Sequence, residues 1–507
     1  MRLLHKGILQ RVSLEAVLHE ADTSEQSGGL IRALGPVHLA TLGIGNAIGA
    51  GIFVLTGEAA AQYAGPAIAL SYVLAGAVCL LTSLCYAEIS TVIPSAGGSF
   101  AYARVTLGRL PAWLIGWSMI MEYLVAGATV AVGWSGYAQD LLAQLGIAVP
   151  RALAGPPLSI VDGRLVSSGG VLNLPAALMV AACTAVLVRG LRHSAVANAS
   201  MVAIKVAVIV IVIAIGSLYV EPANWVPFVP PANAVHRFGW NGVFTASAVA
   251  FFSYSGFEAM STAARECRNV SRDLPIALMA SIAICIVLYV ATALVLTGLA
   301  PYGKLDTASP VSAALRLASP RLAWLVTIVN IGTVLGLGAA VLVSLFGQAR
   351  TFYSMAVVGF LPAAFARVHT RYRTPSVAIL WTGLAGATIA AVLPIELLGE
   401  LVSMGILIAF ASVCLGVLLL RRARPDVARP FRVPGYPWVP WLGLTSCIGL
   451  MFSLPAITWL NIGLWLALGL VLFFALPQSR NGRSTQSSGV VPSTGVAEAA
   501  REGEGTT

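Results

Sequence analysis

The sequence predicts an all-α integral membrane protein with twelve transmembrane helices. Of its 507 residues, 58% are hydrophobic and only 10% are charged, and the mean hydropathy is +0.86. Soluble domains carry about 25% charged residues, so most of this chain must face lipid or other apolar helices. A helix needs about 20 mostly apolar residues to cross a bilayer. Such segments lie near 36–60, 66–93, 112–139, 170–189, 196–219, 241–265, 275–299, 322–349, 375–393, 397–420, 438–457 and 460–477.

These segments divide the chain into a transmembrane domain, residues 36–477, and two polar ends. Residues 1–35 are mixed in charge and lack the short apolar core and small-residue cleavage site of a signal peptide. The longest connection runs from Asp140 to Gly169. Residues 478–507 are rich in Ser, Gly and Thr, and we expect a disordered tail.

The distribution of Lys and Arg predicts the orientation. If the N-terminus is inside, one of the 30 basic residues, Lys205, lies within a span, and six lie in the opposite loops. Those six are Arg151, Arg164, Arg237, Lys304, Arg316 and Arg321. The others all fall in segments on the N-terminal side. Because cytoplasmic loops collect Lys and Arg, both termini are predicted to be cytoplasmic.

Several classes of function lack support in the sequence. The net charge of +10 is explained by topology, and no basic stretch is interleaved with aromatic residues, so nucleic acid is not an expected partner. The seven cysteines form no CxxC pair, which argues against a disulfide framework and against a metal site. The six histidines lie in tails, loops or span ends, and no HExxH, GxSxG or Walker A motif is present. We therefore expect no catalytic residues and no enzyme activity.

A glycine cluster interrupts the first span, where residues 43–53 read GIGNAIGAGIF. Each glycine costs a helix interior about 1 kcal/mol relative to alanine. Two explanations compete. Gly45 and Gly49 have the spacing that lets a neighbouring helix pack closely. Alternatively, the helix is broken here and leaves backbone groups free to bind a polar ligand near the membrane midplane.

A second interruption favours the binding-site explanation. Residues 251–259 of the sixth span read FFSYSGFEA. Irregular backbone at this depth is tolerated only where it lines a cavity or is buried in protein. Breaks in the first and sixth spans, five spans apart, are typical of two inverted five-helix repeats, here about 36–219 and 241–420.

At these residues the chain resembles the amino acid–polyamine–organocation (APC) superfamily of transporters, and within it the cationic amino acid transporter (CAT) branch. The resemblance covers about residues 30–477. It rests on IGAGIFVLTG (48–57), PSAGGSFAYA (94–103), GWSGY (133–137), STAARECRNVSRDLPIAL (261–278), GQARTFYSM (347–355) and RRARPDVARPFRVPGYPWVP (421–440). It implies a secondary active permease with five plus five inverted-repeat helices, two additional helices in 438–477, and alternating access. Twelve spans resemble the bacterial form, which places the protein in the cell inner membrane.

The resemblance also implies where an amino acid would bind. A half-helix N-terminus offers free N–H groups to the carboxylate, and unwound carbonyls suit the ammonium group. The substrate-binding residues implied in this way are Ala47, Ile48, Gly49, Ala50, Gly51, Phe252, Ser253 and Ser255. Ser344 in the eighth span is a candidate wall residue, although Ser in a span often bonds to its own helix.

Aromatic residues flank the second break. In relatives, an aromatic residue at the position of Phe252 covers the substrate as a gate, and Tyr254 is a second candidate. The alternative for Phe252 is ordinary core or lipid packing, and the sequence does not choose between the two.

Lys205 is the cation that lies deepest within a span. It follows Arg192, at the cytoplasmic end, by 13 residues, so it lies about 20 Å along the helix at 1.5 Å per residue. Its side chain is short for bringing the ammonium group back to the membrane surface from that depth. Similar transporters without sodium coupling carry a lysine here, and a buried ammonium can change charge near neutral pH. The resemblance therefore implies a proton as coupling ion and no other cofactor.

Two acidic residues within spans leave open whether the substrate is neutral or cationic. Glu258 either stabilises the N-terminus of a half-helix or senses charge, and Glu122 is either a paired structural acid or a functional one. Only these two could reach a cationic side chain. The sequence favours proton-coupled symport of free neutral L-amino acids. The alternatives are a transporter or exchanger of arginine, lysine or ornithine, and an amino-acid sensor. We expect a monomer in the lipid bilayer.

Overall fold

The computed structural model describes most of the apolar part of the chain. It covers residues 11–13, 35–95, 97–161, 164–190, 195–233, 237–262, 267–372 and 374–475. Most of the expected N-terminal segment 1–35 and the whole expected tail 478–507 lie outside the described residues.

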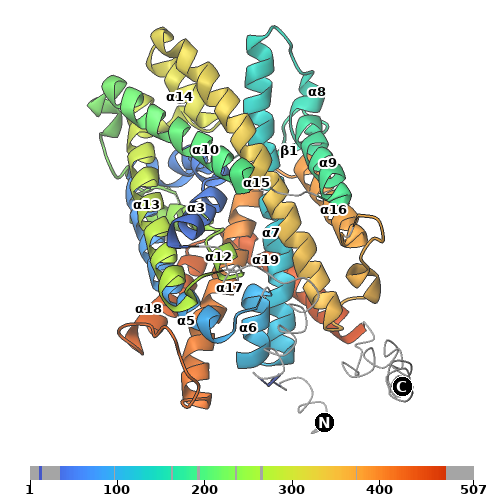
Figure 1. Ribbon diagram of the computed structural model, residues 1–507. Helices are drawn as coiled ribbons and strands as arrows, with labels where there is room; N and C mark the ends of the chain where they lie inside the picture. The colour runs from blue at the N-terminus through green and yellow to red at the C-terminus, as the bar shows by residue number, and fades with distance from the viewer. Residues whose placement is uncertain are drawn as a thin grey trace, which may run out of the picture.

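Helices make up most of the described chain, and most of them run lengthwise in one bundle (Figure 1). The first half contains α3 (Pro36–Ala47), α4 (Thr56–Ala59), α5 (Ile68–Val92), α6 (Gly98–Thr106), α7 (Arg109–Gln144), α8 (Arg151–Ala154), α9 (Leu174–Arg189) and α10 (Ala195–Gly216). The second half contains α11 (Gly239–Ala250), α12 (Glu258–Thr262), α13 (Val270–Leu299), α14 (Pro310–Ala318), α15 (Ala323–Val357), α16 (Ser376–Val392), α17 (Ile395–Ala423), α18 (Trp438–Phe452) and α19 (Ala456–Ala475).

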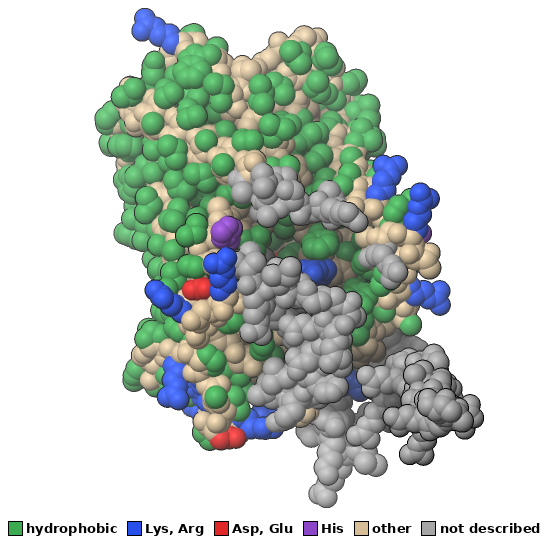
Figure 2. Space-filling view, in the orientation of Figure 1, with side chains coloured by type: hydrophobic (Ala, Val, Ile, Leu, Met, Phe, Trp, Pro, Cys, Tyr) green, Lys and Arg blue, Asp and Glu red, His purple; other side chains and the backbone are tan. Residues whose placement is uncertain are grey.

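Seven helical stretches of the described chain are long and apolar enough to cross a membrane. They are Gly51–Val92, Arg109–Gln144, Ser200–Tyr219, Val270–Leu299, Pro320–Val357, Ile395–Ala423 and Ala456–Ala475. On the face shown in Figure 2, apolar side chains dominate the upper part, and most of the visible Lys and Arg side chains lie in the lower half. The chain is a mostly helical, multi-pass membrane protein.

Helix lies in every segment that the apolar pattern marked, although several boundaries differ. Helices α7 and α15 run beyond the predicted spans 112–139 and 322–349. Helix α18 ends at Phe452 rather than near 457, and α19 begins at Ala456. Pro455 explains the difference, because proline has no backbone N–H and its ring clashes with the preceding helical turn.

The expected all-α fold has one exception, in the long connection between α7 and α9. Strands β1 (Leu158–Val161) and β2 (Arg164–Ser167) pair antiparallel there, with Leu158 opposite Ser167. The two residues between the strands are Asp and Gly, a pair that favours tight hairpin turns. This Asp-Gly pair could be read from the sequence, but it is a short signal compared with the long apolar segments.

Tryptophan residues attach the last helix, α19, to the central helix α7. The indole N–H of Trp117 donates to the carbonyl of Trp465 at 2.8 Å, and the indole of Trp465 donates to the carbonyl of Trp117 at 2.9 Å. Their rings stack at 4.6 Å between centroids. Trp113 donates to the carbonyl of Gly469 at 2.7 Å. A side chain at Gly469 would overlap the Trp117 ring, so only glycine fits there.

We predict that Gly469→Ala destabilises the protein in detergent. The added methyl group collides with Trp117, and overpacking of this kind costs about 1–3 kcal/mol. The midpoint of thermal unfolding should fall by several degrees. Gly463→Ala is a matched control on the same helix, because nothing lies within 4 Å of its added Cβ. Equal unfolding midpoints for the two variants would contradict the proposed role of this contact.

Candidate functional site

The first helix is broken inside the glycine cluster. Helix α3 ends at Ala47, Ile48 has extended backbone (φ −72°, ψ 95°), and helical structure resumes with the π-helical turn η1 (Gly51–Leu55). Gly45 lies before the break, and a Cβ there would overlap Val202 of α10. The cluster therefore does two things: Gly45 permits close helix packing, and residues 48–50 interrupt the helix.

The second break begins where α11 ends at Ala250. One 3₁₀ turn, η6 (Phe251–Tyr254), is followed by extended backbone at Ser255 (ψ 155°) and by Gly256 with φ +100°. Gly256 needs to be glycine because of this φ and because its Cβ would lie 2.7 Å from that of Asn46. At Gly51, a Cβ would lie 2.5 Å from Cα of Ser253. The two breaks are thus in direct contact.

Tyrosine hydroxyls bond to the polar backbone where the breaks meet. The hydroxyl of Tyr72, on α5, lies 3.1 Å from the carbonyl oxygen of Gly51 and 2.6 Å from Oγ1 of Thr56. The hydroxyl of Tyr289, on α13, donates to the carbonyl of Ser253 at 2.8 Å. The hydroxyl of Tyr254 donates to the backbone carbonyl of Tyr72, also at 2.8 Å. Helices α5 and α13 therefore supply bonds that the unwound segments lack.

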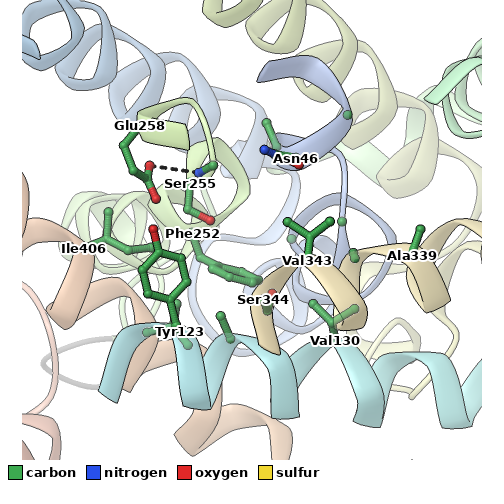
Figure 3. A pocket seen from close by; sticks show the side chains of 18 of the residues that line it. Asn46, Tyr123, Val130, Phe252, Ser255, Glu258, Ala339, Val343, Ser344 and Ile406 are labelled. Atoms are coloured by element: carbon green, nitrogen blue, oxygen red, sulfur yellow. Dashed lines mark hydrogen bonds between the residues drawn. The ribbon is translucent and has the colours of Figure 1, made fainter. Parts of the chain in front are cut away.

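A cavity of about 80 Å³ lies beside these breaks (Figure 3). Its walls come from both broken segments and from α7, α10, α15 and α17. The polar side chains of the lining are Asn46, Glu122, Tyr123, Lys205, Ser255, Glu258 and Ser344. The rest of the lining is Gly45, Ala47, Gly49, Gly51, Ala126, Val130, Met201, Val202, Phe252, Gly256, Ala339, Ala340, Val343, Val402 and Ile406.

The structure brings most of the predicted site residues together at this cavity. Those in its lining are Ala47, Gly49, Gly51, Lys205, Phe252, Ser255, Ser344, Glu122 and Glu258. Four predicted residues do not line it: Ile48, Ala50, Ser253 and Tyr254. The side chains of Ile48 and Ala50 are fully buried in the core. Ser253 and Tyr254 belong to the tyrosine network, and the Tyr254 ring packs against Tyr289 at 5.1 Å between centroids.

Lys205 connects α10 to the end of α3. Its side chain is 3% exposed, and Nζ donates to the carbonyl oxygen of Gly45 at 3.0 Å. The stem packs on Gly336 of α15, where a Cβ would lie 2.7 Å from Cγ of Lys205. The side chain therefore reaches the first break, and it does not snorkel towards the membrane surface.

The two acidic residues of the cavity have different surroundings. One carboxylate oxygen of Glu258 accepts the backbone N–H of Gly256 at 3.0 Å, at the start of α12 (Figure 3). This contact places the carboxylate at the N-terminal end of α12. Glu122 is 4% exposed on α7, and Gly405 of α17 approaches it so closely that a Cβ would lie 3.1 Å from that of Glu122.

Sequence reasoning missed part of the lining. Asn46 and Tyr123 also line the cavity, and they lie on opposite sides of Phe252 in Figure 3. Asn46 could have been found, because it is a polar residue inside the glycine cluster. Tyr123 follows Glu122 directly in a long apolar helix. Val130, Val343 and Ile406 carry no such signal, since their side chains resemble those that face lipid.

The Amino acid permease family model matches residues 34–488 of this chain. The methylthioribose transporter of Bacillus subtilis (strain 168) is 40% identical over 457 residues, which are 90% of this chain and 96% of that protein. The branched-chain amino acid permease BcaP of the same organism is 38% identical over 470 residues, 92% of this chain and 97% of that protein.

More distant relatives include plant proteins of the cationic branch. The vacuolar cationic amino acid transporter 2 of Arabidopsis thaliana is 35% identical over 397 residues, 78% of this chain and 61% of that protein. These similarities confirm the resemblance to the APC superfamily and to relatives of its CAT branch. The chain belongs to the amino acid permease family.

Proposed function

We propose that the protein is a proton-coupled symporter of neutral L-amino acids that works by alternating access in a bacterial inner membrane. The observation that carries the proposal is the cavity at two touching helix breaks. Backbone groups there can serve a carboxylate and an ammonium group. The side-chain part of the cavity is mostly apolar, with Val130, Val343 and Ile406 in its wall. Relatives named for branched-chain amino acids and methylthioribose support a substrate without net charge.

A cationic amino acid is the second candidate, because Glu122 and Glu258 both line the cavity. A buried cationic side chain would need such a partner. Glu258 already accepts a backbone N–H, which leaves Glu122 as the better partner. The plant relatives named as cationic amino acid transporters favour this alternative, at lower identity.

The proposed architecture has twelve spans, with five plus five inverted-repeat helices and two additional ones. Two breaks in corresponding positions support this arrangement. We also propose that both termini are cytoplasmic and that the protein is a monomer. The concentration of Arg in the last turn of α17 and just after it, including Arg421, Arg422 and Arg424, supports the orientation.

We expect purified protein in proteoliposomes to take up radiolabelled neutral amino acids when the outside is more acidic than the inside. Competition by all twenty amino acids and by methylthioribose would define the substrate. Uptake should not depend on sodium. Preferential competition by arginine and lysine would favour the cationic alternative. Binding without uptake would indicate a sensor, and uptake of methylthioribose alone would contradict the amino acid proposal.

Gly49→Ala should weaken substrate binding without destabilising the fold. A Cβ at Gly49 meets only Ala340, at 4.0 Å, so the methyl group fits but occupies space at the cavity. We expect the Kd to rise about tenfold, equivalent to about 1.4 kcal/mol, with an unchanged thermal unfolding midpoint. Gly51→Ala is the contrast, because its Cβ collides with Ser253 and should lower that midpoint. Binding to Gly49→Ala at the wild-type Kd would place the carboxylate elsewhere.

Lys205→Ala should abolish accumulation driven by a proton gradient while leaving exchange of labelled for unlabelled substrate. Without the ammonium group, the bond from α10 to Gly45 is lost, and protonation no longer shifts the population of conformations. Lys205→Arg should not restore coupling, because guanidinium stays protonated. Ile204→Ala, at a partly exposed neighbour on α10, is the control. Full accumulation by Lys205→Ala would exclude the proposed role.

A further inference from the structure

Another buried carboxyl group lies beyond the cavity, on the other half of the first span. Glu58 belongs to α4, seven residues past Gly51, or about 10 Å further along the helix at 1.5 Å per residue. Its side chain is only 2% exposed. Within the described part of the chain, neither of its carboxylate oxygens has a hydrogen-bond partner.

The groups that act electrostatically on Glu58 are all carboxylates. They are Glu396 and Glu400, from the first turns of α17, and Asp306, from the loop before α14. Glu400 accepts hydrogen bonds from the hydroxyls of Tyr63 and Thr458. Glu58 is therefore a buried side chain without a hydrogen-bond partner, and the charged groups that act on it are acids.

The other charged and titratable groups near α4 already have partners. Tyr63, in η2 (Ala60–Ala64), donates to Glu400 at 2.7 Å. Arg316 of α14 pairs with Asp140 of α7. Arg237, just before α11, donates to the carbonyl of Gln62 at 3.1 Å. Helix α11 itself, residues 239–250, has no charged or titratable side chain. Among the described residues, neither Arg316 nor Arg237 forms an ion pair with Glu58.

The segment from Leu305 to Arg316 packs against α4 beside Glu58. A Cβ on the adjacent Gly57 would lie 2.6 Å from the carbonyl oxygen of Leu305 and would also overlap Pro310. On the side of α7, a Cβ on Gly136 would lie 2.5 Å from Cβ of Ala308. These close approaches hold the segment against both α4 and α7. In the proposed orientation this segment lies on the outer side, and it must move before Glu58 can meet water.

An ionised carboxylate without partners is prohibitively costly to bury, and neighbouring carboxylates add repulsion. Among the residues that the structure describes, no group of three or more His, Cys, Asp or Glu side chains is arranged to hold a metal ion. The group that can neutralise Glu58 in this conformation is therefore a proton.

The geometry points to Glu58 as a proton-binding site of the outer gate. When segment 305–316 is displaced, hydronium in the outside solution transfers a proton to the Glu58 carboxylate, forming one O–H bond and releasing water. The neutral side chain can then be buried as the segment closes. On reopening, the proton returns to the same side, so this site sets the external pH dependence of closure without moving charge across the membrane. The inference rests on the proposed transport cycle, but it is separate from coupling at Lys205.

The first test measures exchange of labelled substrate in proteoliposomes at external pH values from about 5 to 9, a range that begins just above the pKa of an exposed Glu. Wild-type exchange should slow severalfold as the outside becomes alkaline. Glu58→Gln, neutral at every pH and of the same shape, should keep the fast rate across the range. Glu221→Gln, at an exposed acid in the connection after α10, should behave like wild type. A wild-type pH profile in Glu58→Gln, or a profile that follows sodium or potassium, would overturn the assignment.

The second test needs no substrate. Leu305, the first residue of the closed segment, is fully buried, so Leu305→Cys should react with a membrane-impermeant thiol reagent only when the segment opens. Labelling should rise severalfold at alkaline external pH, and the added Glu58→Gln substitution should keep it low at every pH. The seven native cysteines are buried. Labelling that is independent of pH in both backgrounds would reject the gate even if transport is confirmed. If uptake fails but labelling of Leu305→Cys still depends on pH through Glu58, the gate is supported and the proposed function is contradicted.

Discussion

The central constraint on this structure is that a polypeptide backbone cannot leave its polar groups unsatisfied inside a membrane. Two helices are nevertheless interrupted in the middle of the bundle, and side chains of neighbouring helices supply hydrogen bonds to their free backbone groups. Tyr72 and Tyr289 extend their hydroxyls to the carbonyls of Gly51 and Ser253. The absence of a side chain at Gly51 lets the two breaks touch, so each shields the other from lipid.

The same arrangement explains why the cavity lies where it does. The interrupted segments are enclosed by α5 and α13 on one side, and α7, α10, α15 and α17 complete the wall on the other. Lys205 spans the space between α10 and the end of α3 through its bond to Gly45. This polar contact links α10 to the first break, which suits the proposed cycle in which helices move relative to one another.

Two groups of buried ionisable side chains lie along the first span. Lys205, Glu122 and Glu258 border the cavity, and Glu58 lies further out with Glu400 and other acids. The two regions are connected through the first span, because Gly51 lines the cavity and α4 continues directly from η1. Charged side chains at such depth are expensive and usually functional. Because they are separate, the proposed coupling at Lys205 and the proposed closure at Glu58 would depend on different protons.

Composition and pattern alone determined the membrane class, the positions of the apolar helices and the two interruptions, because lipid imposes length and polarity on each segment independently of its neighbours. The resemblance of the motifs then predicted residues at both breaks, and nine of the predicted site residues line one cavity.

Tertiary structure decided the rest. Ile48 and Ala50 belong to the same short stretch as Gly49, yet a turn of the backbone points them into the core. Tyr254 faces Tyr72 rather than the cavity. Val130, Val343 and Ile406 line the cavity, and a distant loop packs beside Glu58, only because particular helices pack together. No local pattern in the chain encodes that packing.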